Sequence, residues 1–260
     1  MRRIFSIIIL LALCLPVSAQ YAVPVRTDST SVRGGSGRLS SDFNGTQLIA
    51  PGILLTGGAI IHCFAHQTLD YDIQQWAQND WRGSGNPELD FDNYIQYIPL
   101  AMDLGLGFTG VQAEHHWLDR LMECAIAHLS LGILSGGMKE LIDSPRPNGA
   151  GNNSFPSGHT DLVFTGAELV RMEYGWGWGA GAYAVAATVG MMRLYNNWHW
   201  ASDVIFGAGL GILCAHIGGW LLEPTKQLFG IQIPDNLQFG IAPTVDPLTG
   251  TYCTTIAMRF

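Results

Sequence analysis

The chain has 260 residues, of which 13% are charged and 48% are hydrophobic. A charged fraction of about half the usual value excludes a disordered chain and a coiled coil, and a net charge of −8 argues against nucleic acid as a partner. The mean hydropathy of +0.19 is too low for a chain made entirely of membrane spans. We therefore expect one membrane-contacting domain with polar segments attached, and nothing in the sequence indicates an obligate protein partner.

The first residues have the layout of a secretory signal peptide. A basic pair precedes an apolar run, and a cleavage site follows at Val17-Ser18-Ala19. We predict a signal peptide over residues 1–19 and a polar leader, rich in Ser, Thr and Gly, over residues 20–47. The signal predicts a location in the bacterial cell envelope.

Six apolar segments follow, and each is a candidate helix. They cover Leu48–Phe64, Tyr94–Val111, Leu118–Met138, Leu162–Val170, Trp178–Met192 and Ala201–Leu222. A full membrane span needs about 20 apolar residues, and several segments are shorter or contain ionisable side chains. Tryptophans at segment ends and small residues in the last two segments are nevertheless typical of helices packed in a bilayer. We predict an all-α membrane bundle of five or six helices over residues 48–223, with a soluble helical core as the alternative.

The end of the chain, residues 224–260, has a different character. Two stretches with β-like composition, LQFGIAPTV and TYCTTIAMRF, flank the turn sequence DPLTG. This pattern predicts a short C-terminal β-hairpin.

Two groups of residues form a predicted phosphate-binding loop. Lys139 lies seven residues before Arg146, and the prolines on both sides of Arg146 end the third helix. The sequence PSGH, which contains Ser157, Gly158 and His159, then opens the next helix, where free backbone N–H groups and the helix dipole attract an anion.

A third group supplies candidate catalytic residues. Arg193 precedes His199 by six residues, and Asp203 follows His199 by four. On a helix, that spacing places His199 and Asp203 on one face. Phosphoryl transfer is catalysed mainly by positioning and positive charge, and two histidines can divide the roles of nucleophile and general acid. These residues favour hydrolysis of a phosphate ester, with Asp203 orienting His199.

The patterns K-x6-RP, PSGH and R-x5-H-x3-D, in this order, resemble the three signature motifs of the type-2 phosphatidic acid phosphatase superfamily, which includes the vanadium haloperoxidases. The resemblance implies that His199 forms a phosphohistidine, that Asp203 orients it and that His159 protonates the leaving group. It implies neither a metal nor a cofactor. Met192 stands where the family normally has Ser, so one hydroxyl near the phosphate is missing. The phosphoryl-binding residues implied by the resemblance are Lys139, Arg146, Ser157, Gly158 and Arg193.

The substrate class is inferred from the surroundings of the third motif. Trp198 and Trp200 predict a site at headgroup depth, and Tyr71–Phe91 is expected to include a short interfacial helix. We therefore predict a metal-independent phosphoric ester hydrolase that removes a phosphate monoester or pyrophosphate from a membrane lipid. The alternatives are a soluble periplasmic non-specific acid phosphatase of the same superfamily, a vanadium-dependent haloperoxidase, and a lipid-phosphate binding or transport protein without turnover.

The orientation in the membrane is predicted from basic residues. Arg120, Arg171 and Lys226 fall on the side opposite the catalytic loops, which predicts an inner-membrane protein with its active site facing the periplasm. Six spans after a cleaved signal would conflict with that orientation. We therefore expect Leu48–Phe64 not to cross the membrane completely.

The ionisable residues outside the motifs include two carboxylates and a pair of histidines. Asp103 and Glu123 stand within apolar segments, where a carboxylate in a membrane protein is a candidate functional group. His115 and His116 are expected to form a surface pair at a helix start. The remaining histidines have no ligand spacing, so the sequence predicts no metal site.

Overall fold

The computed structural model describes residues 43–232, 238–245 and 252–259. The expected signal peptide and most of the expected leader lie outside these residues. In chain order the helices are η2 (Gly45–Leu48), α2 (Ile49–Ile60), η3 (Ile61–Asp70), α3 (Tyr71–Trp76), η4 (Ala77–Arg82), α4 (Asp92–Ile95), α5 (Ile98–Gly105), η5 (Leu106–Thr109), α6 (Trp117–Leu141), α7 (Gly158–Tyr195) and α8 (Ala201–Phe229). Here η2 and η5 are 3-10 helices, and η3 and η4 are π-helical.

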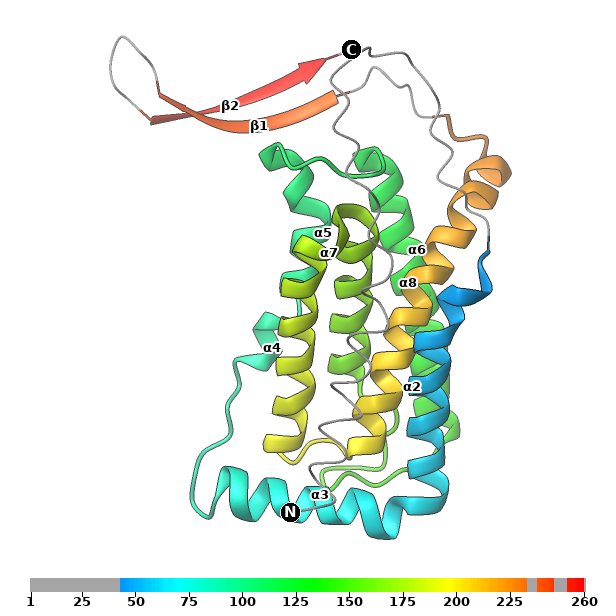
Figure 1. The fold of residues 1–260 in the computed structure, drawn as a ribbon, viewed down its shortest axis with the longest axis vertical. Helices are drawn as coiled ribbons and strands as arrows, with labels where there is room; N and C mark the ends of the chain where they lie inside the picture. Colours follow the sequence, from blue (N-terminus) through cyan, green and yellow to red (C-terminus); the bar gives the residue numbers. More distant parts are fainter. Residues whose placement is uncertain (1–42, 233–237, 246–251, 260) are drawn as a thin grey trace. The chain divides into compact units, whose positions relative to one another are not determined.

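The long helices α2, α5, α6, α7 and α8 run side by side as a bundle (Figure 1). Each of the six predicted apolar segments contains helix. The prediction of an all-α bundle is thus confirmed for the helical part of the chain.

Helix α8 lies at the centre of the packing, against α2, α6 and α7. Its glycines allow the backbones to approach closely. A Cβ atom at Gly209 would lie 2.8 Å from the Leu54 Cβ of α2, and one at Gly211 would overlap the Asp161 carbonyl oxygen of α7. The predicted role of small residues in the last segment is therefore confirmed, because these contacts leave no room for a side chain.

Helix α7 consists of two arms that meet at Gly175. The backbone of Gly175 has a φ of 74°, a conformation that glycine adopts without strain. Val163 and Ala167 of the first arm share one buried apolar cluster with Ala182 and Ala186 of the second. The fourth and fifth predicted segments are therefore the two packed arms of one helix that folds back on itself.

The outer faces of the bundle are suited to lipid. Phe64 is 86% exposed and Ile133 is 74% exposed, and such apolar surface is unusual outside an interaction site. The segment Leu48–Phe64 lies within a helix long and apolar enough to cross a membrane, so its expected partial insertion stays a prediction. Among the described residues, the helices long and apolar enough to cross a membrane are Gly45–Arg82, Trp117–Leu141 and Ala201–Phe229.

The predicted C-terminal hairpin is present. Strand β1 (Gln238–Val245) pairs with strand β2 (Tyr252–Arg259) in antiparallel register. Helix α8 continues past Glu223, with Pro224 inside it, and ends at Gly230 in the left-handed conformation. A single proline removes only one backbone donor, which a helix with a large packed surface tolerates.

The stretch formed by η3, α3 and η4 crosses one end of the bundle (Figure 1). Asp70 anchors it, because its buried carboxylate accepts hydrogen bonds from the Ser202 amide at 2.9 Å, from the Ser202 hydroxyl at 2.7 Å and from His66 Nδ1 at 2.8 Å. Gln74 Nε2 donates to Asn197 Oδ1 at 3.0 Å. This crossing stretch closes the end of the bundle where α8 begins.

Replacing Asp70 tests this anchor. Asp70→Ala leaves the buried Ser202 donors without an acceptor, so we expect the free energy of unfolding to fall by about 1–3 kcal/mol. Thermal unfolding in detergent measures the change. Asp72→Ala removes an exposed carboxylate from the same stretch and should unfold like the wild type. Equal melting temperatures for the two variants would contradict the anchoring role.

Candidate active site

The candidate nucleophile, His199, lies in the turn between α7 and α8. Its ring is buried, with 4% of the residue exposed. Nδ1 donates a hydrogen bond to the Ser154 carbonyl oxygen at 2.8 Å. Since a carbonyl oxygen only accepts, Nδ1 carries the proton and Nε2 is left unprotonated in the neutral ring. The geometry thus leaves Nε2 with the lone pair that the predicted nucleophile needs.

The relation between His199 and Asp203 differs from the expectation. His199 precedes α8, whose first residue is Ala201, so the two side chains do not share a helix face. His199 Nδ1 is 3.5 Å from Asp203 Oδ2, farther than from its carbonyl partner. The Ser154 hydroxyl donates to the same Oδ2 at 2.5 Å, and the Trp200 amide donates to it at 2.9 Å. Asp203 therefore acts on His199 through its charge and through Ser154.

Burial sets the charge state of His199. Desolvation lowers the pKa of this imidazole, and the positive charges of Arg146 and Lys139 lower it further, while Asp203 opposes the shift. The neutral ring is therefore the stable form at neutral pH. A neutral imidazole is the form that a nucleophile requires.

Lys139 and Arg146 are directed by the loop that follows α6. Lys139 Nζ donates to the Pro156 carbonyl oxygen, and also to the Asn153 carbonyl oxygen at 3.2 Å. Arg146 Nε donates to the Asn153 side-chain oxygen at 2.9 Å, and its guanidinium lies 5.4 Å from the centre of the Trp198 ring. One loop thus positions both predicted cations.

Helix α7 begins at Gly158, as predicted, with Ser157 at its N-cap. The first backbone hydrogen bond of this helix joins the Asp161 amide to the Ser157 carbonyl oxygen. The amides of Gly158, His159 and Thr160 precede it, so no preceding turn of helix offers them a carbonyl acceptor. This is the helix start at which the sequence predicts that an anion binds, and that role stays a prediction.

Ser157 itself is fully buried. Its hydroxyl hydrogen-bonds to Thr160 Oγ1 at 2.9 Å, and its amide donates to the Asp203 carbonyl oxygen at 3.2 Å. Ser157 therefore joins α7 to α8, and its role as a phosphate ligand stays a prediction.

The acidic stretch before α5 contributes residues that the sequence did not identify. Asp92 Oδ2 lies 2.6 Å from Arg193 Nη2, and both residues are buried. Asn93 Oδ1 lies 2.8 Å from His159 Nε2. Burial raises the pKa of Asp92, against the opposing charge of Arg193. This acidic stretch therefore holds the predicted arginine and the predicted general acid in place.

The six predicted ionisable groups of the site, including Asp203, gather at one end of the bundle. His159 interacts electrostatically with His199 and with three cations, which are Lys139, Arg146 and Arg193. Met192, which replaces the family's usual Ser, is buried in α7 beside Arg193.

An open groove leads to this end of the bundle. It has a volume of about 410 Å³ and lies between α6 and the first arm of α7. Leu131, Gly132 and Leu162 contribute to its wall, and Lys139 and Gly158 border it. The groove thus joins an apolar surface to the phosphate-binding residues.

The protonation of His199 can be measured directly. By NMR of protein with ¹⁵N-labelled histidine, we expect the Nδ1–H tautomer and a pKa below the ordinary value of about 6.5. In Asp203→Asn the pKa should fall further, because the charge that raises it is gone. Ser154→Ala should keep the tautomer, because the acceptor is a main-chain carbonyl. A proton on Nε2 in the wild type would contradict this geometry.

Comparison with known proteins places these motifs in a family. A model described as the PAP2 superfamily matches residues 120–225. A lipid A 1-phosphatase of Porphyromonas gingivalis is 35% identical over 147 residues, which are 54% of this chain and 33% of that protein. This chain therefore spans about a third of the length of that relative.

Two solved structures are similar to parts of the chain. LpxE of Aquifex aeolicus is 23% identical, covers 58% of this chain and 94% of its own, and has a TM-score of 0.46. A transmembrane PAP2 type phosphatidylglycerolphosphate phosphatase of Bacillus subtilis is 22% identical, covers 70% of this chain and 96% of its own, and has a TM-score of 0.48. The matched residues 120–225 hold all three motifs, from Lys139 to Asp203, so this part of the chain is similar to the PAP2 superfamily.

Proposed function

We propose that this protein is a phosphatase that removes phosphate from a membrane lipid through a phosphohistidine at His199. The observation that carries the proposal is the buried His199 ring, whose proton is held on Nδ1 by a carbonyl oxygen while two predicted phosphate-binding cations act on it electrostatically. A neutral imidazole with a free Nε2 in a positive environment matches the needs of attack on a phosphate dianion.

The reaction divides between two histidines. His199 Nε2 attacks phosphorus, the bond from phosphorus to the ester oxygen breaks, and that oxygen takes a proton from the imidazolium form of His159, a form that the negative charge of bound substrate favours. His159 then accepts a proton from water, whose oxygen attacks the phosphohistidine and releases inorganic phosphate. The steps restore both rings and use only side chains of this chain. Lys139, Arg146 and Arg193 stabilise the negative charge on the phosphoryl oxygens.

The lipid substrate is inferred from the surface around the site. The groove between α6 and α7 ends at Lys139 and Gly158, and it can hold an acyl chain while the phosphate lies at the helix end. Exposed apolar side chains on α2 and α6 favour this substrate class over water-soluble esters. The related lipid A 1-phosphatase makes a lipid A phosphate the first substrate to test.

We propose that the active-site end faces the periplasm from the inner membrane. Arg120, Arg171 and Lys226 belong to parts of the helices remote from the catalytic motifs, and an excess of basic residues is typical of cytoplasmic ends. Their side chains are engaged, since Arg171 pairs with Glu168 and Lys226 pairs with Asp119. The proposal is therefore supported by the number of basic residues in these parts of the helices. It does not draw on an exposed basic surface, because Arg171 and Lys226 are paired with carboxylates.

A lipid panel tests the reaction and the substrate together. Wild-type protein in detergent should release phosphate from one or more of lipid A, phosphatidic acid, phosphatidylglycerophosphate and undecaprenyl pyrophosphate. His199→Ala should lose at least about a thousandfold in rate, because no nucleophile remains. Acid-labile ³²P on the wild-type protein, absent from the variant, would identify the phosphohistidine.

The controls separate the rival functions. His116→Ala changes a histidine at the start of α6 and should keep the wild-type rate. Release from short soluble esters only would contradict the lipid preference and favour a non-specific acid phosphatase. Halide oxidation that depends on added vanadate would instead indicate a haloperoxidase, and lipid binding without release would indicate a transport protein.

The Asp92–Arg193 pair gives a further prediction. Asp92→Asn leaves a buried guanidinium without its counter-charge, so we expect a lower melting temperature for the free protein. Added orthovanadate should raise the melting temperature more in this variant than in the wild type, because the anion supplies the missing charge. Asp90→Asn, an exposed neighbour, should respond like the wild type. Equal stabilisation of the wild type and Asp92→Asn by the anion would contradict the pairing.

A further inference from the structure

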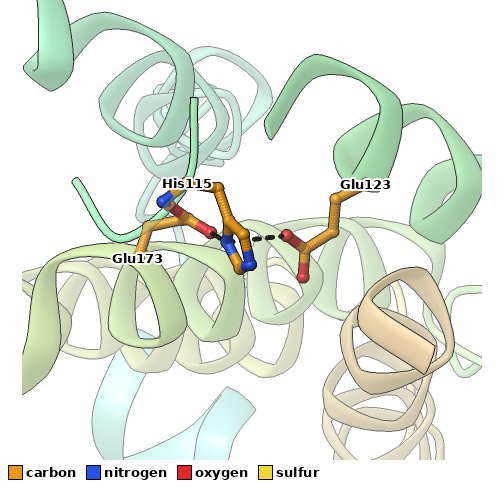
Figure 2. A group of neighbouring side chains, drawn as sticks. All are labelled: His115, Glu123 and Glu173. Carbon is orange, nitrogen blue, oxygen red and sulfur yellow. Dashed lines mark hydrogen bonds and ion pairs between the residues drawn. The ribbon is translucent and has the colours of Figure 1, made fainter. Parts of the chain in front are cut away.

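A second cluster of ionisable side chains lies near the start of α6, far along that helix from Lys139. His115 precedes α6, Glu123 lies on α6, and Glu173 ends the first arm of α7 (Figure 2). His115 Nδ1 contacts Glu173 Oε1 and lies 3.8 Å from Glu123 Oε2. The expectation that His115 belongs to a surface pair is therefore wrong, because the fold brings two carboxylates from distant sequence to its ring.

The three side chains are arranged as metal ligands are. One ligand atom from each residue lies within 4.8 Å of the others. The His115 ring points between the two carboxylates (Figure 2). Glu173 Oε2 also accepts the His115 amide at 3.0 Å, which fixes the orientation of this carboxylate. Three elements thus present donor atoms to a common point.

Glu123 provides an independent sign of a missing ligand. The residue is 1% exposed, and neither of its carboxylate oxygens accepts a hydrogen bond. Its side chain points toward His115 (Figure 2). On α8, a Cβ atom at Gly219 would lie 3.1 Å from Glu123 Oε1, so the neighbouring helix encloses the carboxylate without offering it a donor. A buried carboxylate without hydrogen bonds is costly unless a cation accompanies it.

The charges around the cluster do not balance. Asp103 is also 1% exposed, and both of its carboxylate oxygens lack a hydrogen-bond donor. Arg120 directs its guanidinium to the Asp103 carbonyl oxygen at 2.8 Å and to the Tyr174 hydroxyl, instead of to Glu123. The buried carboxylates of Asp103, Glu123 and Glu173 therefore have one arginine and one histidine as cationic neighbours. A further positive charge would bring this cluster closer to neutrality.

We propose that His115, Glu123 and Glu173 bind a divalent transition-metal cation, of which Zn²⁺ and Mn²⁺ are the first to test. One imidazole nitrogen with two carboxylates is a donor set typical of these ions, whereas Mg²⁺ and Ca²⁺ prefer oxygen ligands alone. Binding replaces the proton on His115 Nδ1, which leaves to solvent as the nitrogen donates its electron pair to the metal.

The site would cross-link three elements. It joins the segment before α6, α6 itself and the first arm of α7 next to the turn at Gly175. The ion would thus hold the fold-back of α7 in place. This proposal does not rest on the proposed phosphatase reaction, whose residues lie at the other ends of the same helices.

Metal analysis of the tag-free full-length chain in detergent tests the site. Protein treated with chelator and then dialysed against Zn²⁺ or Mn²⁺ should retain about one ion per chain by mass spectrometry, with a higher melting temperature. Glu123→Gln, which keeps the size of the side chain, should bind at least about tenfold more weakly. Glu223→Gln removes a carboxylate from α8 that pairs with Lys226 outside the cluster, and it should bind like the wild type.

These outcomes distinguish a metal site from a cluster whose carboxylate charges are neutralised by protons. Wild-type protein that retains neither ion would overturn the proposal, and so would equal binding by Glu123→Gln and the wild type. Should Glu123→Gln not fold, the visible absorption of wild-type protein loaded with Co²⁺ decides. The proposal is supported if the wild type shows absorption bands of a cobalt ion bound by nitrogen and oxygen and these bands vanish in His115→Ala. The absence of such bands from the wild type refutes it.

Discussion

The organisation of the catalytic end depends on the carboxylate of Asp203. One of its oxygens accepts the Ser154 hydroxyl and the Trp200 amide, so a single group both caps α8 and holds the loop that precedes α7. The same loop supplies the carbonyl oxygen that fixes the proton of His199. Because a buried carboxylate must be satisfied by donors, the helix start, the loop and the nucleophile cannot move independently.

The cationic side chains at this end are positioned by hydrogen bonds and by one ion pair, which do not neutralise all of their charge. Lys139 and Arg146 are oriented by oxygens of uncharged groups, which leave their charges available to an anion. Arg193 differs, because it faces the buried carboxylate of Asp92. The ion pair with Asp92 compensates the buried charge of Arg193. The neutral partners of Lys139 and Arg146 leave the charges of those two side chains available to the predicted phosphate.

The motifs predicted side chains that the structure brings together at one end of the bundle, because their spacing reflects local structure. The PSGH sequence predicts a helix start, and α7 does begin at Gly158. Partners from distant sequence were not predicted. Asp92 lies in an acidic run that has the composition of a solvated loop, and Ser154 contributes through a main-chain carbonyl that any residue possesses. Neither role leaves a signal in residue type or spacing.

The amino-acid sequence by itself determined the helical class, the positions of the long helices and the motif side chains gathered at one end of the bundle, because apolar segments and motif spacing act over a few turns of helix. Only the tertiary structure decided that Asp203 reaches His199 through Ser154, and that His115 meets Glu123 and Glu173. The physical reason is that α7 folds back at Gly175 and packs on α8, so residues far apart along the chain become neighbours only after the bundle has closed.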